Sequence, residues 1–521
     1  MTSMSFKNNL AMPIVGGIVK RAFSLADRKV QGIGQSPFEL QSKTLQKLLK
    51  KAEYTAFGKN YNFHNILREY DLIQAYQDQV PFFDYDKIYD EWWHRALNNS
   101  ESNVTWPGQI PYFALSSGTT GAPSKYIPMT TDMIKAIRTS SLRTFFAATR
   151  FGLGADFFGK QGLFVSGSAT LKKHGNAFVG DMSGISMKSR PMWAKGLSKP
   201  EHQIQSMPDW SSRLNAIARN APKWDIVFLS GLPSWVQVMI ERVMEHNKLD
   251  SIHQIWPNLR VFAHGGIAFE PHRAAFDRLM TKPMIYIDTY LASEGFVAFQ
   301  NRLETRSMAL ILNNGVFHEF IPFNEANFDS DGQIKGKPRA YSADEVQVGV
   351  EYALAISTCA GAWRYLIGDT VRFTDARRKE LVITGRTKHF LSVTGEHLSV
   401  DNMNQGVQYA AETLKIDVKE FAVSPVLSDG KYAHKWYIGC EPSPNTEAFK
   451  KLLEEKICAI NDDYATERTA VLREPQIVAV PPHFFHEYLN LQGKGGGQAK
   501  FPRVLKSEAF ADWEKFVEAK K

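Results

Sequence analysis

Short apolar runs that alternate with helical stretches are the feature that most constrains how this chain folds. Residues 162–165, 225–229 and 259–263 are apolar runs with the length of a buried strand. The second run leads into a helical stretch over residues 233–245. Strands that alternate with helices form a largely parallel sheet, whose ligands bind at the carboxyl ends of the strands. We therefore predict an α/β fold with a site at that edge.

Further along, the pattern changes to strand after strand. Between about residues 299 and 384, the runs 308–312, 316–321, 353–358 and 381–383 are separated by glycine-containing turns. This part predicts a β-rich, barrel-like subdomain, built as a meander or a small barrel.

Near the N-terminus, Leu45, Leu48, Leu49 and Ala52 recur at helical spacing on a lysine-rich segment. The spacing predicts an amphipathic helix that packs on the larger domain. Because 521 residues exceed the size of one hydrophobic core, we expect two or more domains.

A polar loop follows the apolar residues 112–115. It consists of Ser116, Ser117, Gly118, Thr119, Thr120, Gly121, Ala122, Pro123, Ser124 and Lys125. Glycine lets the backbone approach a ligand, hydroxyl and amide groups donate to phosphate oxygens, and lysine adds a positive charge. The loop is not a Walker A motif, because Gly118 and Gly121 are too close together. It predicts a phosphate-binding loop, with an ordinary surface turn as the alternative.

Two further polar clusters lie downstream. The apolar run 284–289 ends in Tyr290, Ser293 and Glu294, a set that could stack a base, contact a phosphate and hold Mg²⁺. Gly368 and Asp369 precede a strand-like run, where a carboxylate could accept both hydroxyls of a ribose. A polar turn explains either cluster equally well when it is taken alone.

In this order, the clusters resemble the signature motifs of a known family. They are similar to Ser-Ser-Gly-Thr-Ser/Thr-x-Gly, Tyr-x-x-Ser-Glu and Tyr-x-x-Gly-Asp of the auxin-responsive Gretchen Hagen acyl-acid amido synthetases, within the adenylate-forming superfamily. A fourth segment, Gln498-Ala499-Lys500-Phe501-Pro502-Arg503, resembles the family's Gln-x-Lys-x-Pro-Arg. The likeness runs from about Gln41 to near the C-terminus.

Two departures from the family pattern stand out. Leu366 occupies a position where plant members usually carry arginine, and Arg364 is a candidate to compensate for it. Ala499 replaces an aromatic residue before Lys500.

The resemblance implies an architecture. A large N-terminal adenylation domain would span residues 1–385, with the β-rich subdomain at about 299–384. A small, mobile α+β C-terminal domain would span 386–521, with a hinge at about 384–390.

The resemblance also implies an activity that uses ATP and Mg²⁺. A carboxylic acid would be converted to acyl-AMP with release of pyrophosphate, and an amino acid amine would then displace AMP to form an amide. The nucleotide-binding residues would be Ser116, Ser117, Gly118, Thr119, Thr120, Gly265, Thr289, Tyr290, Ser293, Glu294, Asp369, Arg386 and Lys500. Thr119, Glu294 and Lys500 are the expected catalytic residues, and Glu294 is the expected Mg²⁺ ligand.

The acyl pocket is expected to be apolar or aromatic. Phe164 and Met182 come from the stretch that would line it. His264, which precedes two glycines, could polarise a substrate or deprotonate the amine, or it could be a hydrogen-bonded structural residue.

Composition narrows the choice of partners and compartment. The 62 basic residues are interleaved with 54 acidic ones without a nucleic-acid motif, so we expect no nucleic-acid partner despite the net charge of +8. No run reaches the ~18 apolar residues of a membrane span. Cys359, Cys440 and Cys458 show no CxxC spacing, which favours the cytoplasm and disfavours a disulfide framework or a zinc site.

Two alternatives to an amido synthetase remain, and both use the same loop. One is an acid:thiol ligase that passes the acyl group to coenzyme A, and the other is a nucleotide-regulated binding protein without turnover. No sequence motif identifies the acid or the amino acid. No motif identifies the oligomeric state either, and we expect a monomer.

Overall fold

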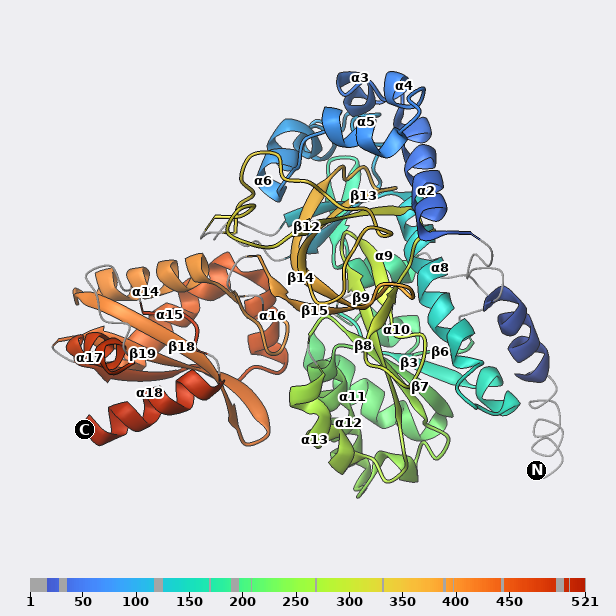
Figure 1. The fold of residues 1–521 in the computed structure, drawn as a ribbon. Helices are drawn as coiled ribbons and strands as arrows, with labels where there is room; N and C mark the ends of the chain where they lie inside the picture. Colours follow the sequence, from blue (N-terminus) through green and yellow to red (C-terminus); the bar gives the residue numbers. More distant parts are fainter. Residues whose placement is uncertain are drawn as a thin grey trace, which may run out of the picture. The chain divides into compact units, whose positions relative to one another are not determined.

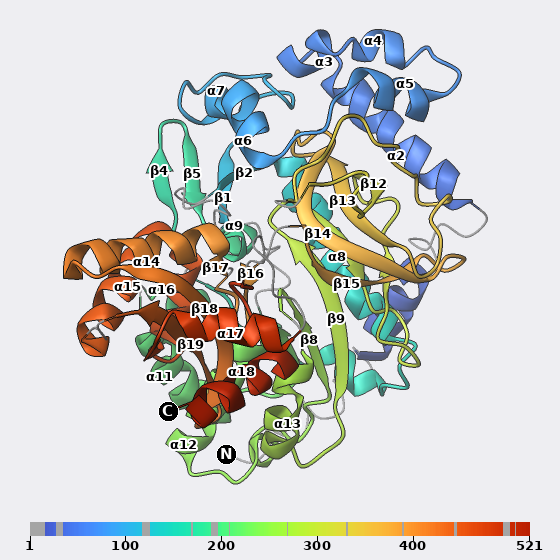
Figure 2. The same ribbon diagram turned by 60° about the vertical axis from the view of Figure 1, so that its left-hand side comes forward.

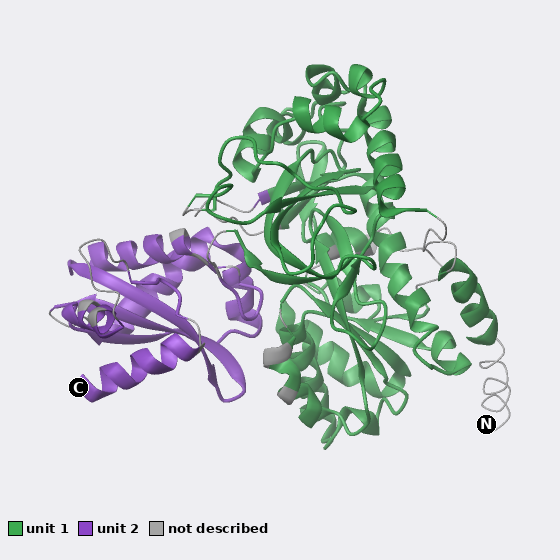
Figure 3. Cartoon of the chain, viewed as in Figure 1, with its two compact units in different colours: residues 1–115, 126–387 green, residues 116–125, 388–521 purple. Residues whose placement is uncertain are grey.

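The chain divides into two compact units (Figure 3). Unit 1 comprises Met1–Leu115 and Tyr126–Thr387, and unit 2 comprises Ser116–Lys125 and Lys388–Lys521. The computed structural model describes residues 16–27, 35–116, 125–167, 170–188, 196–207, 209–267, 269–329, 332–387, 390–396, 398–441, 445–492, 501–505 and 507–520.

Unit 1 begins with helices (Figure 1). They are α2 (Pro37–Ala52), α3 (Ala56–Asn60), α4 (Phe63–Ile66), α5 (Leu72–Gln79), α6 (Tyr85–Ile88), η1 (Tyr89–Trp93) and α7 (His94–Leu97). The Ser36 hydroxyl caps α2 by accepting from the Glu39 amide, and the Glu39 carboxylate accepts from the Ser36 amide. Leu45, Leu48 and Leu49 lie on its buried face, as the sequence predicted. That face packs against strand β12.

The largest sheet among the described residues of unit 1 has eleven strands. One half is parallel and has the order β9 (Ile285–Ala292), β8 (Val261–Gly265), β7 (Ile226–Gly231), β3 (Gln161–Phe164) and β6 (Ser198–Lys199). The accompanying helices are α9 (Met182–Lys188), α10 (His202–Gln205), α11 (Trp210–Asn220), α12 (Pro233–Asn247) and α13 (Glu270–Leu279). The predicted α/β fold is confirmed.

The other half of this sheet is an antiparallel meander. Its order from β9 outward is β10 (Gly295–Phe299), β11 (Met308–Leu310), β15 (Glu380–Arg386), β14 (Tyr365–Asp375), β13 (Glu351–Thr358) and β12 (Val316–Pro322). The predicted succession of strands is present, but it does not close into a barrel within the described residues. The strands instead extend one open sheet beyond β9, with which β10 pairs antiparallel. Strand β9 and the strands β12 to β15 can be followed in Figure 2.

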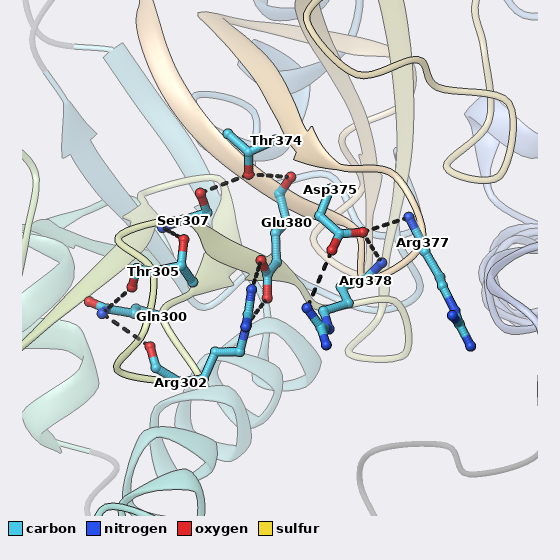
Figure 4. A network of polar contacts seen from close by, with 9 residues as sticks. All are labelled: Gln300, Arg302, Thr305, Ser307, Thr374, Asp375, Arg377, Arg378 and Glu380. Carbon is cyan, nitrogen blue, oxygen red and sulfur yellow. Dashed lines mark hydrogen bonds and ion pairs between the residues drawn. The ribbon is translucent and has the colours of Figure 1, made fainter.

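A network of polar contacts holds the end of β10 against the β14–β15 hairpin (Figure 4). The Arg302 guanidinium donates to both carboxylate oxygens of buried Glu380, at 2.6 and 2.8 Å. Gln300 donates to the carbonyl oxygens of Arg302 and Thr305. The Arg302–Glu380 pair thus ties the segment after β10 to β15, in the same sheet as β9.

A second sheet in this part of the chain has four strands among the described residues. Its order is β2 (Lys125–Met129), β1 (Tyr112–Ser116), β5 (Ala177–Gly180) and β4 (Lys172–His174). Helix α8 (Thr131–Ala148) follows β2, and the hydroxyl of Thr130 caps it by accepting from the Met133 amide. Because α8 packs on β10, it connects this sheet with the larger one.

Unit 2 is an α+β unit. Its main sheet contains β18 (Val418–Ser428), β19 (Lys431–Cys440) and β20 (Gln476–Val480), and the short strands β16 (Phe390–Leu391) and β17 (Leu398–Ser399) pair with each other. The helices are α14 (Val400–Leu414), α15 (Thr446–Ile460), α16 (Asp462–Ala470), α17 (His483–Leu491) and α18 (Ser507–Lys520). Trp436 and Tyr437 on β19 belong to two different apolar clusters, because successive strand residues point to opposite faces.

A fully buried carboxylate closes the turn that leads to α14. The Glu396 carboxylate accepts from the amides of Val393, Thr394 and Gly395 at 2.8 to 3.0 Å, and His434 Nε2 lies 2.8 Å away. Burial by itself raises the pKa of Glu396. The hydrogen bond and charge interaction with His434, together with the backbone amides, outweigh burial and lower the pKa to about 2.

This turn predicts a pH-dependent contribution to stability. Because the pKa of Glu396 is lower in the folded chain, its stabilising effect is complete above the unfolded pKa and is lost as the pH falls toward about 2. We expect Glu396→Gln to lower the free energy of unfolding by about 2 kcal/mol at neutral pH, because an amide N–H₂ would face hydrogen-bond donors. Urea unfolding from about pH 7 to about pH 3 measures the effect, which should shrink with pH. The control is Glu455→Gln at an exposed position of α15. A difference that stays constant with pH would contradict the prediction.

Candidate active site

The carboxyl ends of β8 and β9 carry two of the predicted residues. Gly265 pairs with Thr289 in the parallel register, and the Thr289 hydroxyl donates to the His264 carbonyl oxygen at 2.8 Å. A Cβ at position 265 would lie 2.3 Å from the Thr289 carbonyl oxygen, so glycine is required there. The two strand ends are therefore held together at the edge where ligands bind in parallel sheets.

Three residues that are distant in sequence meet beside this edge. The Tyr290 hydroxyl donates to Asp369 Oδ2 at 2.6 Å, and the Arg386 guanidinium pairs with Asp369 Oδ1. Asp369 on β14 stands opposite Arg386 on β15, while Tyr290 comes from β9. Asp369 and Tyr290 are both buried. We call Tyr290, Asp369 and Arg386 the carboxylate cluster.

Glu294 adds a second negative charge near the carboxylate cluster. Together with the half-buried Ser293, it forms the two-residue turn between β9 and β10. Burial raises the pKa of Tyr290 well above its usual value, and the charges of Asp369 and Glu294 raise it further. Burial opposes the charge on Arg386, but Asp369 and Glu294 stabilise it and raise its pKa. Within the described part of this site, the carboxylate cluster and Glu294 together contribute two carboxylates and one guanidinium.

No group of three or more His, Cys, Asp or Glu side chains within the described ranges is arranged to bind a metal ion. Mg²⁺ in nucleotide enzymes takes one or two carboxylates and completes its ligands with phosphate oxygens and water. Glu294 is the buried carboxylate that suits this requirement.

Several predicted residues cannot be compared with the structure. Ser117, Gly118, Thr119, Thr120 and Lys500 lie outside the described residues. Ser116 is the last residue of β1. The expectations for the phosphate loop and for the catalytic lysine thus stay predictions.

His264 lies in an aromatic environment. It is 1% exposed, and its ring stacks on Phe269 with the centroids 4.2 Å apart. Burial, followed by the charges of Arg273 and His272, lowers the pKa of His264 to about 3. Burial thus disfavours the protonated imidazole, while His264 Nδ1 lies 3.3 Å from Asp288 Oδ1. A role of His264 toward the substrate or the amine stays a prediction.

The two apolar residues expected in the acyl pocket lie in different clusters. Phe164 packs near Phe228, with ring centroids 6.0 Å apart, in the cluster beneath β7 and β8. Met182 packs against the large cluster that includes Tyr290. Of the two, Met182 thus shares an apolar cluster with a residue of the carboxylate cluster.

Arg364 does not replace the arginine that is missing at position 366. Its guanidinium is buried and pairs with buried Glu319 at 3.0 Å. It also donates to the carbonyl oxygens of Gln77 and Val80, at 2.8 and 2.7 Å. Leu366 packs in a small apolar cluster. The expected compensation is wrong because the guanidinium is already engaged in the core.

Arg143 is a residue that the sequence analysis missed. It is only 9% exposed on α8 and has no hydrogen-bond or ion-pair partner among the described residues. Burial lowers its pKa to about 10. The sequence did contain an indication that Arg143 is buried. It follows the helical spacing of the buried residues Ile137, Ser140 and Ala147 on α8. A buried cation without a protein partner is suited to an anionic ligand.

The fold is that of adenylate-forming enzymes. A solved structure titled GH3.15 acyl acid amido synthetase superposes with a TM-score of 0.57 at 18% identity, over 92% of this chain and 93% of that chain. A 2-hydroxyisobutyryl-CoA ligase structure gives a TM-score of 0.57 at 12% identity, over 94% of both chains. At these identities the likeness concerns the fold alone.

The chain belongs to the GH3 family. It matches the GH3 family N-terminal domain over residues 28–221, the central domain over 309–385 and the C-terminal domain over 401–509. It is 22% identical over 485 residues to jasmonoyl-L-amino acid synthetase JAR4 of Nicotiana attenuata, covering 80% of this chain and 81% of that protein. It is 26% identical over 212 residues to indole-3-acetic acid-amido synthetase GH3.4 of Arabidopsis thaliana. The latter match covers 37% of this chain and spans only 35% of that protein.

A search of the described helices for membrane spans found none with the necessary length and apolar character.

Proposed function

We propose that this protein is an ATP-dependent acyl-acid amido synthetase. The observation that carries the proposal is the carboxylate cluster with Glu294 beside it, at the carboxyl edge of β9 in a chain with GH3 family domains. The substrates would be a small carboxylic acid, ATP and an amino acid. We also propose a cytoplasmic location, because the three cysteines are free.

The reaction has two steps. In the first, a carboxylate oxygen of the acid attacks the α-phosphorus of ATP, and pyrophosphate leaves with the electrons of the broken P–O bond. In the second, the amine nitrogen attacks the acyl carbon, AMP leaves with the electrons of the C–O bond, and the amine loses a proton. Activation is needed because an oxide is a poor leaving group from a carboxylate.

Asp369 would bind the ribose of the nucleotide. A carboxylate has about four lone-pair sites, of which Tyr290 and Arg386 each use one. Sites on both oxygens remain for the two ribose hydroxyls. Tyr290 and Arg386 would hold the carboxylate in a fixed orientation, so that the ribose finds its acceptors already in place.

Negative charge grows on the phosphates during the first step. Ser116 to Thr120 would donate to them, and Lys500 would add a positive charge. Glu294 would hold Mg²⁺, which, when bound, neutralises phosphate charge and orients the leaving group.

Arg143 would contribute to binding of the acid. It is one of the buried residues of α8, the helix that packs on β10, and β10 begins directly after Glu294. We expect Arg143→Met to raise the KM for the acid by about tenfold or more and to change kcat less, because a charge-assisted hydrogen bond contributes about 1.5–3 kcal/mol. The control is Arg138→Met at an exposed position on the same helix. If Arg143 is only structural, its removal will leave the KM for the acid unchanged.

The decisive experiment has two arms. Exchange of labelled pyrophosphate into ATP, measured across a panel of acids, detects adenylation, and no exchange with any acid would favour a binding protein. Product analysis with amino acids or with coenzyme A then identifies the acceptor. Amide formation supports the proposal, whereas thioester formation alone would assign the protein to the acid:thiol ligases.

A further inference from the structure

A second candidate site lies beside α2. It is a cavity of about 370 Å³ in unit 1, within the range of small-molecule sites. Lys43, Lys47 and Lys51 line it together with Trp106 and Asp132. None of the residues assigned above to the nucleotide lines this cavity. It is therefore a distinct feature of the same unit.

The three lysines lie along one face of the helix. They are four residues apart, which places one ammonium group on each successive turn. Lys51 pairs with Asp132 at 2.6 Å, and the same carboxylate oxygen accepts from Trp106 Nε1 at 2.9 Å. The Asp132 carboxylate therefore already has two partners within the cavity lining, Lys51 and Trp106.

Lys43 and Lys47 differ from Lys51. Within the described residues, neither ammonium group has a hydrogen-bond or ion-pair partner. Like charges at this spacing on a helix repel each other by about 0.2–0.5 kcal/mol. Two such charges at the rim of a cavity match a dianion, and phosphate is the common small dianion that such groups bind.

Apolar side chains form part of the cavity lining, which we call its floor. Leu40 and Leu48 are buried there, and Trp106 is 3% exposed. The Lys51 ammonium group lies over the Trp106 ring, 5.6 Å from its centroid. A ligand that carries a phosphate and a small apolar body would place its charge between Lys43 and Lys47 and its body on this floor.

We propose that the α2 cavity binds a small phosphate-bearing organic molecule. The inference is independent of the amido synthetase activity, because it uses only the charges and lining of this cavity. Since α2 packs on β12 of the large sheet, a bound ligand would also stabilise unit 1 against unfolding.

The test uses phenyl phosphate as the probe and the full-length protein. Binding is measured by calorimetry, with AMP in excess to occupy the candidate nucleotide site. We expect the double variant Lys43→Gln/Lys47→Gln to weaken binding by about tenfold or more. The matched control is Lys50→Gln, which removes a lysine from the same helix outside the cavity lining.

Each outcome decides the proposal. A selective loss in the double variant, with the control unchanged, supports it. Equal binding by all three proteins, or an equal loss in the control, would overturn it, because the lysines of the cavity would then have no special role. Benzoate that binds as tightly as phenyl phosphate would overturn the assignment to phosphates. Thermal unfolding without ligand shows whether the double variant is folded.

Discussion

Asp369→Ala should lower acid-dependent pyrophosphate exchange by about 100-fold or more. The substitution removes the proposed acceptor of both ribose hydroxyls, and it leaves the Arg386 guanidinium without its carboxylate. Tyr290→Phe should cost less, about 10-fold, because it removes one hydrogen bond to a charged group and retains the ring. Exchange measured at saturating acid, over a range of ATP concentrations, separates the effect on ATP binding from the effect on the rate.

The matched control lies on the same strand. Asp375 at the far end of β14 accepts from the amides of Arg377 and Arg378 in its own turn, so Asp375→Asn should leave exchange within about twofold of the natural protein. Circular dichroism verifies that each variant is folded. If Asp369→Ala, properly folded, exchanged as fast as Asp375→Asn, the proposed role of the carboxylate cluster would be refuted.

In the parallel half of the large sheet, β7 and β8 were predictable because most of their residues are buried on both faces. Such strands are continuous apolar runs, and residues 225–229 and 259–263 correspond closely to β7 and β8. The open meander was not predictable in the same way. Its order depends on β11 pairing with β15, whose residues are about seventy positions apart, and no local spacing encodes that partner.

The site was only partly predictable for a related reason. Tyr290 and Asp369 belong to recognisable motifs, but their hydrogen bond and the partnership with Arg386 follow from strand register. Arg143 was missed because an arginine inside a helix is usually exposed, and only its phase on α8 shows that it is buried. For His264, the sequence did not predict the stacking of its ring on the ring of Phe269.

The largest expected effect on stability concerns Glu319. Its carboxylate is fully buried and accepts from Arg364 Nε and Nη2 at 3.0 to 3.1 Å, and from the Gln77 amide at 3.1 Å. Removing one partner of a buried pair leaves an uncompensated charge, so we expect Glu319→Ala to lower the free energy of unfolding by about 3–5 kcal/mol. Urea unfolding at neutral pH gives this value.

A surface pair provides the comparison for Glu319. Glu245→Ala removes the exposed partner of Arg242, and it should change the free energy of unfolding by less than about 1 kcal/mol. If Glu319→Ala had an equally small effect, the buried pair would not stabilise the core. A further substitution, Arg364→Met in the Glu319→Ala background, should restore part of the loss because no unpaired charge remains. The recovery should be incomplete, since the carbonyl oxygens of Gln77 and Val80 would then lose their donor.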